Sequence, residues 1–299
     1  MTNNLTPDSA CRTFFSNDIH FASFSNAILF DGKQVIHPER LVRYENDTSF
    51  IINDTKTVED EKRRRDIVVK TDVNGIYCLF GIEHQSSIDQ EMVIRCGNYE
   101  MVEYLKQLKN KKLKRLVPQV MIVFYTGDKK WNAPVKLSDY LDVPKELKAY
   151  VNEWRFIFID VKEIDTSKIK DAQTRYFIEA IQNMYKGNYD KLHRRIKMNR
   201  NNFIYAAIIT GSIDLIKDLP EGDEIDMCEG MERMAEGFRS EGKLEEKRST
   251  LKEQLIIKLG AVSSRLEEQL TNASLEKLNV LTRNIFDITS EEDVLRIIH

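Results

Sequence analysis

The chain has 299 residues, of which 41% are hydrophobic and 31% are charged, so it can bury one large core or two small ones. This balance excludes a chain that is disordered throughout. Its 45 basic and 48 acidic residues give a formal net charge of −3, which excludes a uniformly basic nucleic-acid-binding module; any contact with phosphate therefore requires a local basic surface.

The first predicted element is a helix over residues 9–30, where aromatic and aliphatic residues recur at three- and four-residue steps. Asp31 and Gly32 end it. Residues 37–62 mix short apolar pieces with Asn, Asp and Thr, and a charged run follows at 59–65. Arg64 and Arg65 in that run are either phosphate contacts or part of a solvated strand edge.

Residues 65–85 predict a β-hairpin. Two β-prone runs, 67–69 and 76–82, flank Asn74-Gly75, and this pair between such runs is the strongest short-range signal for a hairpin. With Asn74 and Gly75 as the two central residues of the turn, Asp66 lies opposite Glu83.

This register brings three polar side chains to one face of the hairpin. Directly opposed residues have Cβ atoms about 5 Å apart, and Gln85 shares the face because it lies two residues beyond Glu83. The opposite face is predicted to pack against the core, since it carries Ile67, Val69, Cys78, Phe80 and Ile82. A one-residue slip would mix the two sets, so the pattern specifies the register.

Two interpretations of this polar face remain open from the residues alone. In the first, Asp66 and Glu83 repel each other across the ladder until a divalent cation such as Mg²⁺ neutralises them, and Gly81 leaves room for a ligand. In the second, Asp66 pairs with a nearby arginine, Glu83 is a solvated strand residue, and the hairpin is only scaffold. His84 points to the other face and is predicted to be structural.

The rest of the chain predicts an α/β fold followed by helices. Residues 89–109 read as a helix between two parallel strands, the second at 117–125, and a further strand follows at 154–161. Helices are expected at 168–186, 189–216 and 224–260, with two or three short ones in the tail, where Ser290 is a predicted N-cap. The expected domains are a core at 1–165, a helical part at 166–223 that packs on or continues it, and a helical extension at 224–299.

Two further basic clusters have alternative explanations. The first lies at the end of the helix at 89–109, and its members either contact DNA or complement the helix dipole; they are Lys106, Lys109, Lys111, Lys112, Lys114 and Arg115. The second spans residues 193–200 and is either a DNA-groove contact or an exposed helix face. Four scattered cysteines without a CxxC pair predict neither disulfides nor a zinc site.

Several motifs, in this order and spacing, carry a resemblance to a known family. They are FASFSNAILFDGKQVIHPERL, then Arg65-Asp66-Ile67, then GIEHQSS from Gly81, then the helix with Arg95 and Tyr99, then VPQVMIVFYTGDKKWNAP. Together they resemble the recombination-promoting nuclease family, also called transposase-like or YhgA-type, within the PD-(D/E)XK nuclease superfamily. The helical tail is similar to the C-terminal extension of many members.

The resemblance implies a restriction-endonuclease-like core, a mixed sheet flanked by helices, and Mg²⁺-dependent cleavage of DNA, with Mn²⁺ as an expected substitute. It implies that Asp66 and Glu83 bind the metal and that Gln85, in the place of the superfamily lysine, orients water or holds a phosphate oxygen. The residues expected to contact nucleic acid are Arg64, Arg65, Arg95 and Tyr99.

The sequence departs from the family pattern at two places. Gln85 is neutral where the superfamily has a lysine, and the acidic residue of the first helix is Asp8, Asp18 or absent. A catalytically degenerate DNA-binding or assembly module is therefore the alternative, and an RNA nuclease is a third. We expect a cytoplasmic protein, nucleoid-associated if DNA-bound, without a membrane span, and self-association through the C-terminal helices.

Overall fold

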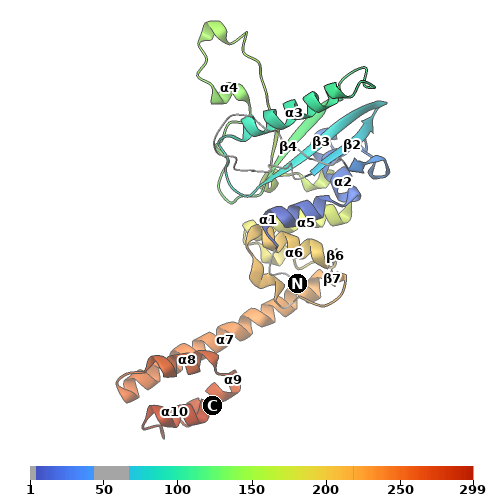
Figure 1. Cartoon of the computed structure of the whole chain (residues 1–299). Helices are drawn as coiled ribbons and strands as arrows, with labels where there is room; N and C mark the ends of the chain where they lie inside the picture. The colour runs from blue at the N-terminus through green and yellow to red at the C-terminus, as the bar shows by residue number, and fades with distance from the viewer. Residues whose placement is uncertain (1–4, 44–66, 218, 299) are drawn as a thin grey trace. The chain divides into compact units, whose positions relative to one another are not determined.

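The structure, a computed structural model, describes residues 5–43, 67–217 and 219–298 (Figure 1). The chain divides into two compact units, Met1–Glu229 and Gly230–His299. Each has its own arrangement of elements.

A five-stranded mixed sheet forms the centre of the first unit. Its strands lie in chain order and comprise β1 (Val42–Arg43), β2 (Ile67–Val73), β3 (Ile76–Gln85), β4 (Gln119–Tyr125) and β5 (Ile157–Asp160). The pairs β1–β2 and β2–β3 are antiparallel, whereas β3–β4 and β4–β5 are parallel. The predicted α/β class is therefore observed as a mixed sheet.

The predicted hairpin is confirmed in both its turn and its register. Asn74 and Gly75 have positive φ angles of 52° and 83°, as a two-residue type I′ turn requires. Val73 pairs with Ile76, and the ladder continues in that register to Ile67 opposite Ile82. This register fixes which side chains of β3 lie on each face of the sheet, as the sequence predicts.

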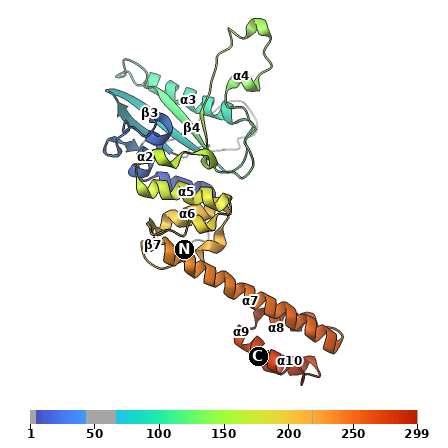
Figure 2. The same ribbon diagram turned by 180° about the vertical axis from the view of Figure 1, so that it is seen from behind.

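Helices cover both faces of the sheet (Figures 1 and 2). On one face lies α3 (Met92–Lys109), which connects the parallel strands β3 and β4; on the other lie α1 (Pro7–Phe15), α2 (Asp18–Phe30) and α5 (Ala172–Tyr185). The rings of Phe15 and Phe24 pack edge-on against Phe124 of β4, with centroids 5.5 and 5.2 Å away. The central strands are thus buried on both sides.

The prediction of one continuous helix over residues 9–30 was wrong. The helix breaks at Ser16 and Asn17, where Asn17 takes an extended conformation and its Oδ1 accepts hydrogen bonds from the backbone N–H groups of Ile19 and His20. An asparagine that caps a helix in this way competes effectively with helix continuation. The break turns α2 against the sheet.

The prediction of one helix over residues 189–216 was also wrong. This region holds β6 (Lys197–Asn199) and α6 (Arg200–Thr210), and β6 pairs with β7 (Glu224–Asp226) in a second, two-stranded sheet. Asn199 again starts the helix by capping it. The short helices are α4 (Leu137–Tyr140), η1 (Pro38–Arg40), η2 (Lys145–Leu147), η3 (Val161–Glu163), η4 (Thr166–Lys168), η5 (Tyr189–Lys191) and η6 (Ile213–Ile216).

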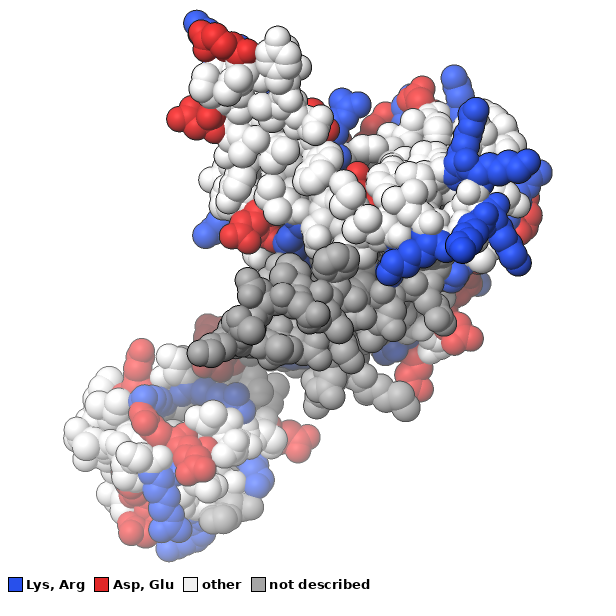
Figure 3. All heavy atoms as spheres, turned by 45° about the horizontal axis from the view of Figure 1, so that its top comes forward, with Lys and Arg blue, Asp and Glu red and all other residues white. Residues whose placement is uncertain are grey.

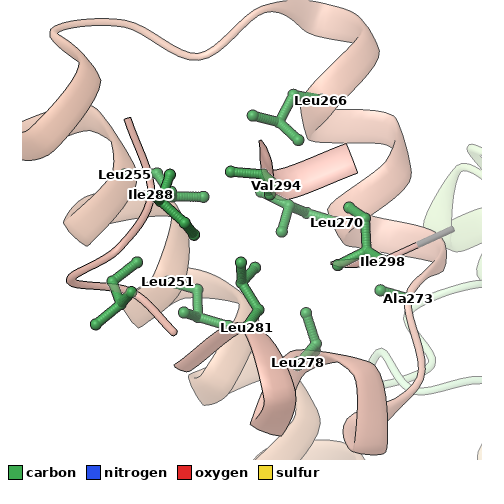
Figure 4. Packing of buried hydrophobic residues seen from close by; sticks show 11 residues of the cluster. Leu251, Leu255, Leu266, Leu270, Ala273, Leu278, Leu281, Ile288, Val294 and Ile298 are labelled. Carbon is green, nitrogen blue, oxygen red and sulfur yellow. The ribbon is translucent and has the colours of Figure 1, made fainter. Parts of the chain in front are cut away.

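The second unit is helical and has its own core (Figure 4). It contains most of α7 (Met227–Leu259), then α8 (Ser264–Asn272), α9 (Leu275–Arg283) and α10 (Glu291–Ile298). Leucines and isoleucines from all four helices, including Leu255, Leu266 and Leu281, are buried together. Ser290 caps α10 as predicted, since its Oγ accepts from the N–H of Asp293 while the Asp293 carboxylate accepts from the N–H of Ser290.

Candidate functional site

Polar residues gather where the parallel strands end. Gln85 lies beside Tyr125, the last residue of β4, and Tyr125 lies beside Asp160, the last residue of β5. Glu83 precedes Gln85 by two residues and shares its face of the sheet. The carboxyl edge of parallel strands is where α/β sheets commonly bind ligands, so this edge is the candidate site.

An arginine from α3 neutralises Glu83 inside the protein. The Glu83 side chain is only 3% exposed, and its Oε1 accepts a hydrogen bond of 2.8 Å from Nη2 of Arg95. Nη1 of the same arginine donates to Oδ2 of Asp89 at 2.5 Å. Burial alone would lower the pKa of Arg95, but hydrogen bonds to Tyr99 and Asp89 and the charge of Glu83 raise it above the ordinary arginine value. Arg95 therefore stays charged and holds both carboxylates.

Tyr99 lies one helical turn beyond Arg95 and packs in the core under α3. Its ring is buried with Cys96 and Val123, and its hydroxyl oxygen is 3.5 Å from Nη2 of Arg95. Burial and the nearby charge of Glu83 raise the pKa of Tyr99. The hydroxyl therefore remains protonated at neutral pH, and its oxygen is available to the arginine.

A second polar network occupies the other face of β3, to which alternation directs His84. Nδ1 of His84 lies 2.6 Å from Oδ1 of Asp8 in α1, and Nε2 lies 2.7 Å from Oγ1 of Thr126, just past β4. The histidine side chain is 1% exposed, whereas that of Asp8 is 59% exposed. His84 thus links the first helix to the ends of two strands.

The structure distinguishes the two acids considered for the first helix. The hydrogen bond with His84 lowers the pKa of Asp8 despite some desolvation, and the charges of His84, Arg12 and Arg95 act in the same direction. Asp18 instead accepts a hydrogen bond of 2.5 Å from Nη2 of Arg43 in β1. Asp8 is therefore the first-helix acid that lies at the end of β3.

Two expectations for this face of the hairpin were wrong. The space beside Gly81 holds the side chain of Met121 instead of a ligand, since a Cβ built there would lie 2.6 Å from its Sδ. Glu83 is not a solvated strand residue, because it is buried. The reason is the same in both cases: the Met121 side chain of β4 and the helix α3 cover the face that the isolated hairpin pattern leaves open.

The remaining predicted residues, Arg64, Arg65 and Asp66, lie outside the described part of the chain. Within residues 5–43, 67–217 and 219–298, no three His, Cys, Asp or Glu side chains gather as a metal site would require. The described donors nonetheless suit Mg²⁺, which prefers carboxylate and amide oxygens of the kind that Glu83 and Gln85 carry. Among the described helices, none combines the length and apolar character needed to cross a membrane.

The fold and this edge define an α/β protein with a buried carboxylate and an amide at the end of a central strand. Residues 33–203 match a protein family described as "Putative transposase, YhgA-like", which covers more than half of the chain. The chain belongs to this YhgA-like transposase family. Searches of curated proteins and of solved structures gave no match.

Proposed function

We propose that this chain is a metal-dependent DNA endonuclease of the PD-(D/E)XK type, with Asp66, Glu83 and Gln85 at its active site. The observation that carries the proposal is the position of Glu83: a buried carboxylate on the central strand, two residues before the half-buried Gln85 at the carboxyl edge. Asp66 directly precedes Ile67, which pairs with Ile82, the neighbour of Glu83. Membership of a transposase-like family supports DNA as the substrate.

In this proposal each side chain has a separate task. Glu83, together with Asp66, would hold Mg²⁺, which when bound lowers the pKa of a water molecule and stabilises charge on the phosphate. The Gln85 amide would orient the attacking water or hold a phosphate oxygen. Arg95 fixes the orientation of Glu83 and places positive charge beside it. The water oxygen would attack phosphorus as the bond to the leaving sugar oxygen breaks, with one proton lost by the water and one taken up by the sugar oxygen.

Plasmid nicking tests the proposal. Wild type should cleave with Mg²⁺ or Mn²⁺ and not with EDTA, while Glu83→Gln and Asp66→Asn should lose at least about 100-fold in rate, as removal of a charged transition-state group does. The matched control is Glu103→Gln, because Glu103 is a second buried glutamate of the same unit, on α3 near the other end of the sheet. Wild-type rates in Glu83→Gln would refute the site.

A second candidate function is a catalytically degenerate member that binds DNA without cutting it. The ion pair of Glu83 with Arg95 favours it, since an arginine already neutralises the carboxylate that a metal would otherwise neutralise. The neutral side chain of Gln85, in the place of the superfamily lysine, also favours this second function. Tight binding of DNA with no cleavage under any divalent ion, in both wild type and Glu83→Gln, would select this function; cleavage confined to RNA would instead change the substrate.

A further inference from the structure

A dense basic segment lies near the other end of the sheet from the candidate site. Residues 106–115 carry six cations and no acidic residue, and Lys and Arg side chains gather over this end of α3 on the right of Figure 3. Helix α3 ends at Lys109. The four cations beyond that residue, which we call the basic turn, are Lys111, Lys112, Lys114 and Arg115. The helix dipole falls off within the last turn, so it accounts for Lys106 and Lys109 but not for the basic turn.

The basic turn is held in one conformation by hydrogen bonds at both ends. Asn110 begins it: its Oδ1 accepts from the N–H of Lys112, and its carbonyl accepts from the N–H of Leu113. Gln107 closes it, since its Oε1 accepts from the N–H of Val117 at 2.7 Å and its Nε2 donates to the carbonyl of Val117. A ligand that contacts the turn would therefore order little additional backbone.

The positive charge of the turn has no acidic partner among the residues that the structure describes. Within the described part of the chain, the four side chains are exposed and none has an ion pair with an acidic residue. Nearby, Lys70 of β2 and Lys106 line one hollow of about 170 Å³, whose lining also includes the buried Glu103. Concentrated charge of one sign destabilises a fold through self-repulsion and attracts a polyanion.

The spacing along β3 relates this surface to the candidate site. Leu79 lines the hollow beside Lys106, whereas Gln85 ends the same strand six residues later. At about 3.3 Å per residue, the two places are about 20 Å apart along the strand. A duplex rises about 3.4 Å per base pair, so about six base pairs would span that distance.

We propose that the basic turn is a docking surface for the phosphate backbone of double-stranded DNA, separate from the cleavage site. Exposed lysine and arginine side chains on a hydrogen-bonded turn, without acidic partners among the described residues, fit the regularly spaced phosphates of a duplex, and such contacts carry affinity without reading sequence. The choice of duplex DNA rests on the proposed function, whereas the existence of a polyanion surface does not.

The test measures binding to a fluorescent 30-base-pair duplex at several salt concentrations, with fluorescence anisotropy as the readout. EDTA is present throughout, so that metal-dependent cleavage cannot interfere. The full chain is compared with the four-fold variant Lys111→Gln, Lys112→Gln, Lys114→Gln and Arg115→Gln. Each lost phosphate contact makes the negative slope of log K against log salt shallower by about 0.9, so the loss of four contacts predicts a slope about 3.6 less negative and a Kd at least about 10-fold weaker at 0.1 M salt. The pair Lys111→Gln and Lys112→Gln should give about half the change in slope.

A control variant removes the same charge elsewhere. Arg239→Gln, Lys243→Gln, Arg265→Gln and Arg283→Gln change four exposed cations of Gly230–His299, and the slope and Kd should stay at the wild-type values. An equal change in both four-fold variants would show a general charge effect and overturn the proposal. Tighter binding of the wild type to single-stranded RNA or to phosphatidylserine vesicles than to the duplex would overturn the choice of partner.

The two proposals fail separately. A wild type that cuts DNA but binds the duplex independently of the basic turn would refute the docking surface alone. A wild type that never cuts but loses duplex binding when the turn is neutralised would refute the nuclease and keep the surface.

Discussion

Arg95 is the side chain on which the candidate site depends, because it bridges a buried and a half-buried carboxylate. It contacts Glu83 at 2.8 Å and Asp89 at 2.5 Å from two different nitrogens. A guanidinium can do this with its planar fork of donors, whereas the ammonium of a lysine is a single point charge. The geometry thus explains why an arginine, and not a lysine, stands at this position of α3.

We predict that Arg95→Met destabilises the first unit by about 3 kcal/mol at pH 7, because it removes the arginine from a buried carboxylate. Arg95→Lys should recover part of the loss. The double variant Arg95→Met with Glu83→Gln should be more stable than Arg95→Met alone, since the uncompensated charge is gone. Urea unfolding of wild type, Arg95→Met, Glu83→Gln and the double variant forms a double-mutant cycle, and additive effects would contradict the predicted coupling.

The contact between Asp8 and His84 predicts a pH dependence of stability. The folded chain lowers the pKa of Asp8 below its ordinary value of 3.8, so the ionised carboxylate stabilises the fold at pH values above 3.8. That contribution is lost as pH falls through the lowered pKa. Because the Asp8 side chain is more than half exposed, solvent screens the contact, and its contribution at neutral pH should be below about 1 kcal/mol.

Carboxyl carbon-13 NMR measures this effect directly. In wild type, the Asp8 resonance should titrate below pH 3.8, and in His84→Gln its midpoint should move upward toward that value. The Tm difference between wild type and Asp8→Asn should be present at pH 7 and shrink below pH 3.8. An unchanged Asp8 midpoint in His84→Gln would show that the histidine is not the cause.

Part of the site can be predicted from the sequence, whereas the rest depends on contacts between residues that are distant in the chain. Hairpin register places Glu83 and Gln85 on one face and His84 on the other, since alternation is a local property. The contacts of His84 with Asp8 and Thr126 join residues 76 and 42 positions away in the chain. The contact with Thr126 could have been predicted from strand pairing. His84 pairs with Phe124 in the parallel ladder, and Thr126 lies two residues after Phe124, just beyond the end of β4. No local pattern selects Asp8 over Asp18.

At the scale of elements, Gly97 of α3 lets the helix approach the chain that leads into β5. A Cβ built on Gly97 would collide with the ring of Trp154, which is rigid and cannot yield as a methionine side chain does. Gly242 of α7 is also helical, but nothing lies within 4 Å of its Cβ position. The two glycines therefore share a conformation and differ only in their surroundings.

We predict opposite effects of alanine at these two glycines. Gly97→Ala should destabilise the first unit by about 1–3 kcal/mol because of overpacking, although alanine is ordinarily the better helix former. Gly242→Ala should stabilise its helix by up to about 1 kcal/mol. Thermal unfolding followed by circular dichroism measures both, and tryptophan fluorescence should shift only in Gly97→Ala. Stabilisation by both substitutions would show that Trp154 does not pack on α3.

The elements themselves were predictable where one local signal dominated. The Asn-Gly turn and the strand–helix–strand order at 76–125 predicted the hairpin and the parallel pair correctly. The helix breaks at Asn17 and Asn199 were missed, because apolar periodicity continues across both caps while the backbone does not. The same periodicity did not reveal that both faces of β3 are covered, since that depends on which helices pack on the sheet.

At the scale of the whole molecule, the two units have separate cores. In the first, Phe14 of α1 stacks on Phe177 of α5 with ring centroids 3.6 Å apart. In the second, Leu255 of α7 is fully buried among residues of α8 to α10. Domains with separate hydrophobic cores can unfold separately. The self-association expected for the C-terminal helices remains a prediction.

We predict two thermal transitions, each sensitive to one substitution. Leu255→Ala should cost about 2–5 kcal/mol and lower only the transition of Gly230–His299, whereas Phe177→Ala should cost about 3–5 kcal/mol and lower only that of Met1–Glu229. For small domains each kcal/mol shifts Tm by about 4–8 °C, so calorimetry resolves the shifts. A single transition that both substitutions lower equally would mean that the units unfold cooperatively. If the transitions are separate, Leu255→Ala should leave the proposed DNA cleavage unchanged at temperatures where only the second unit is unfolded, because Glu83 and Gln85 lie wholly within the first.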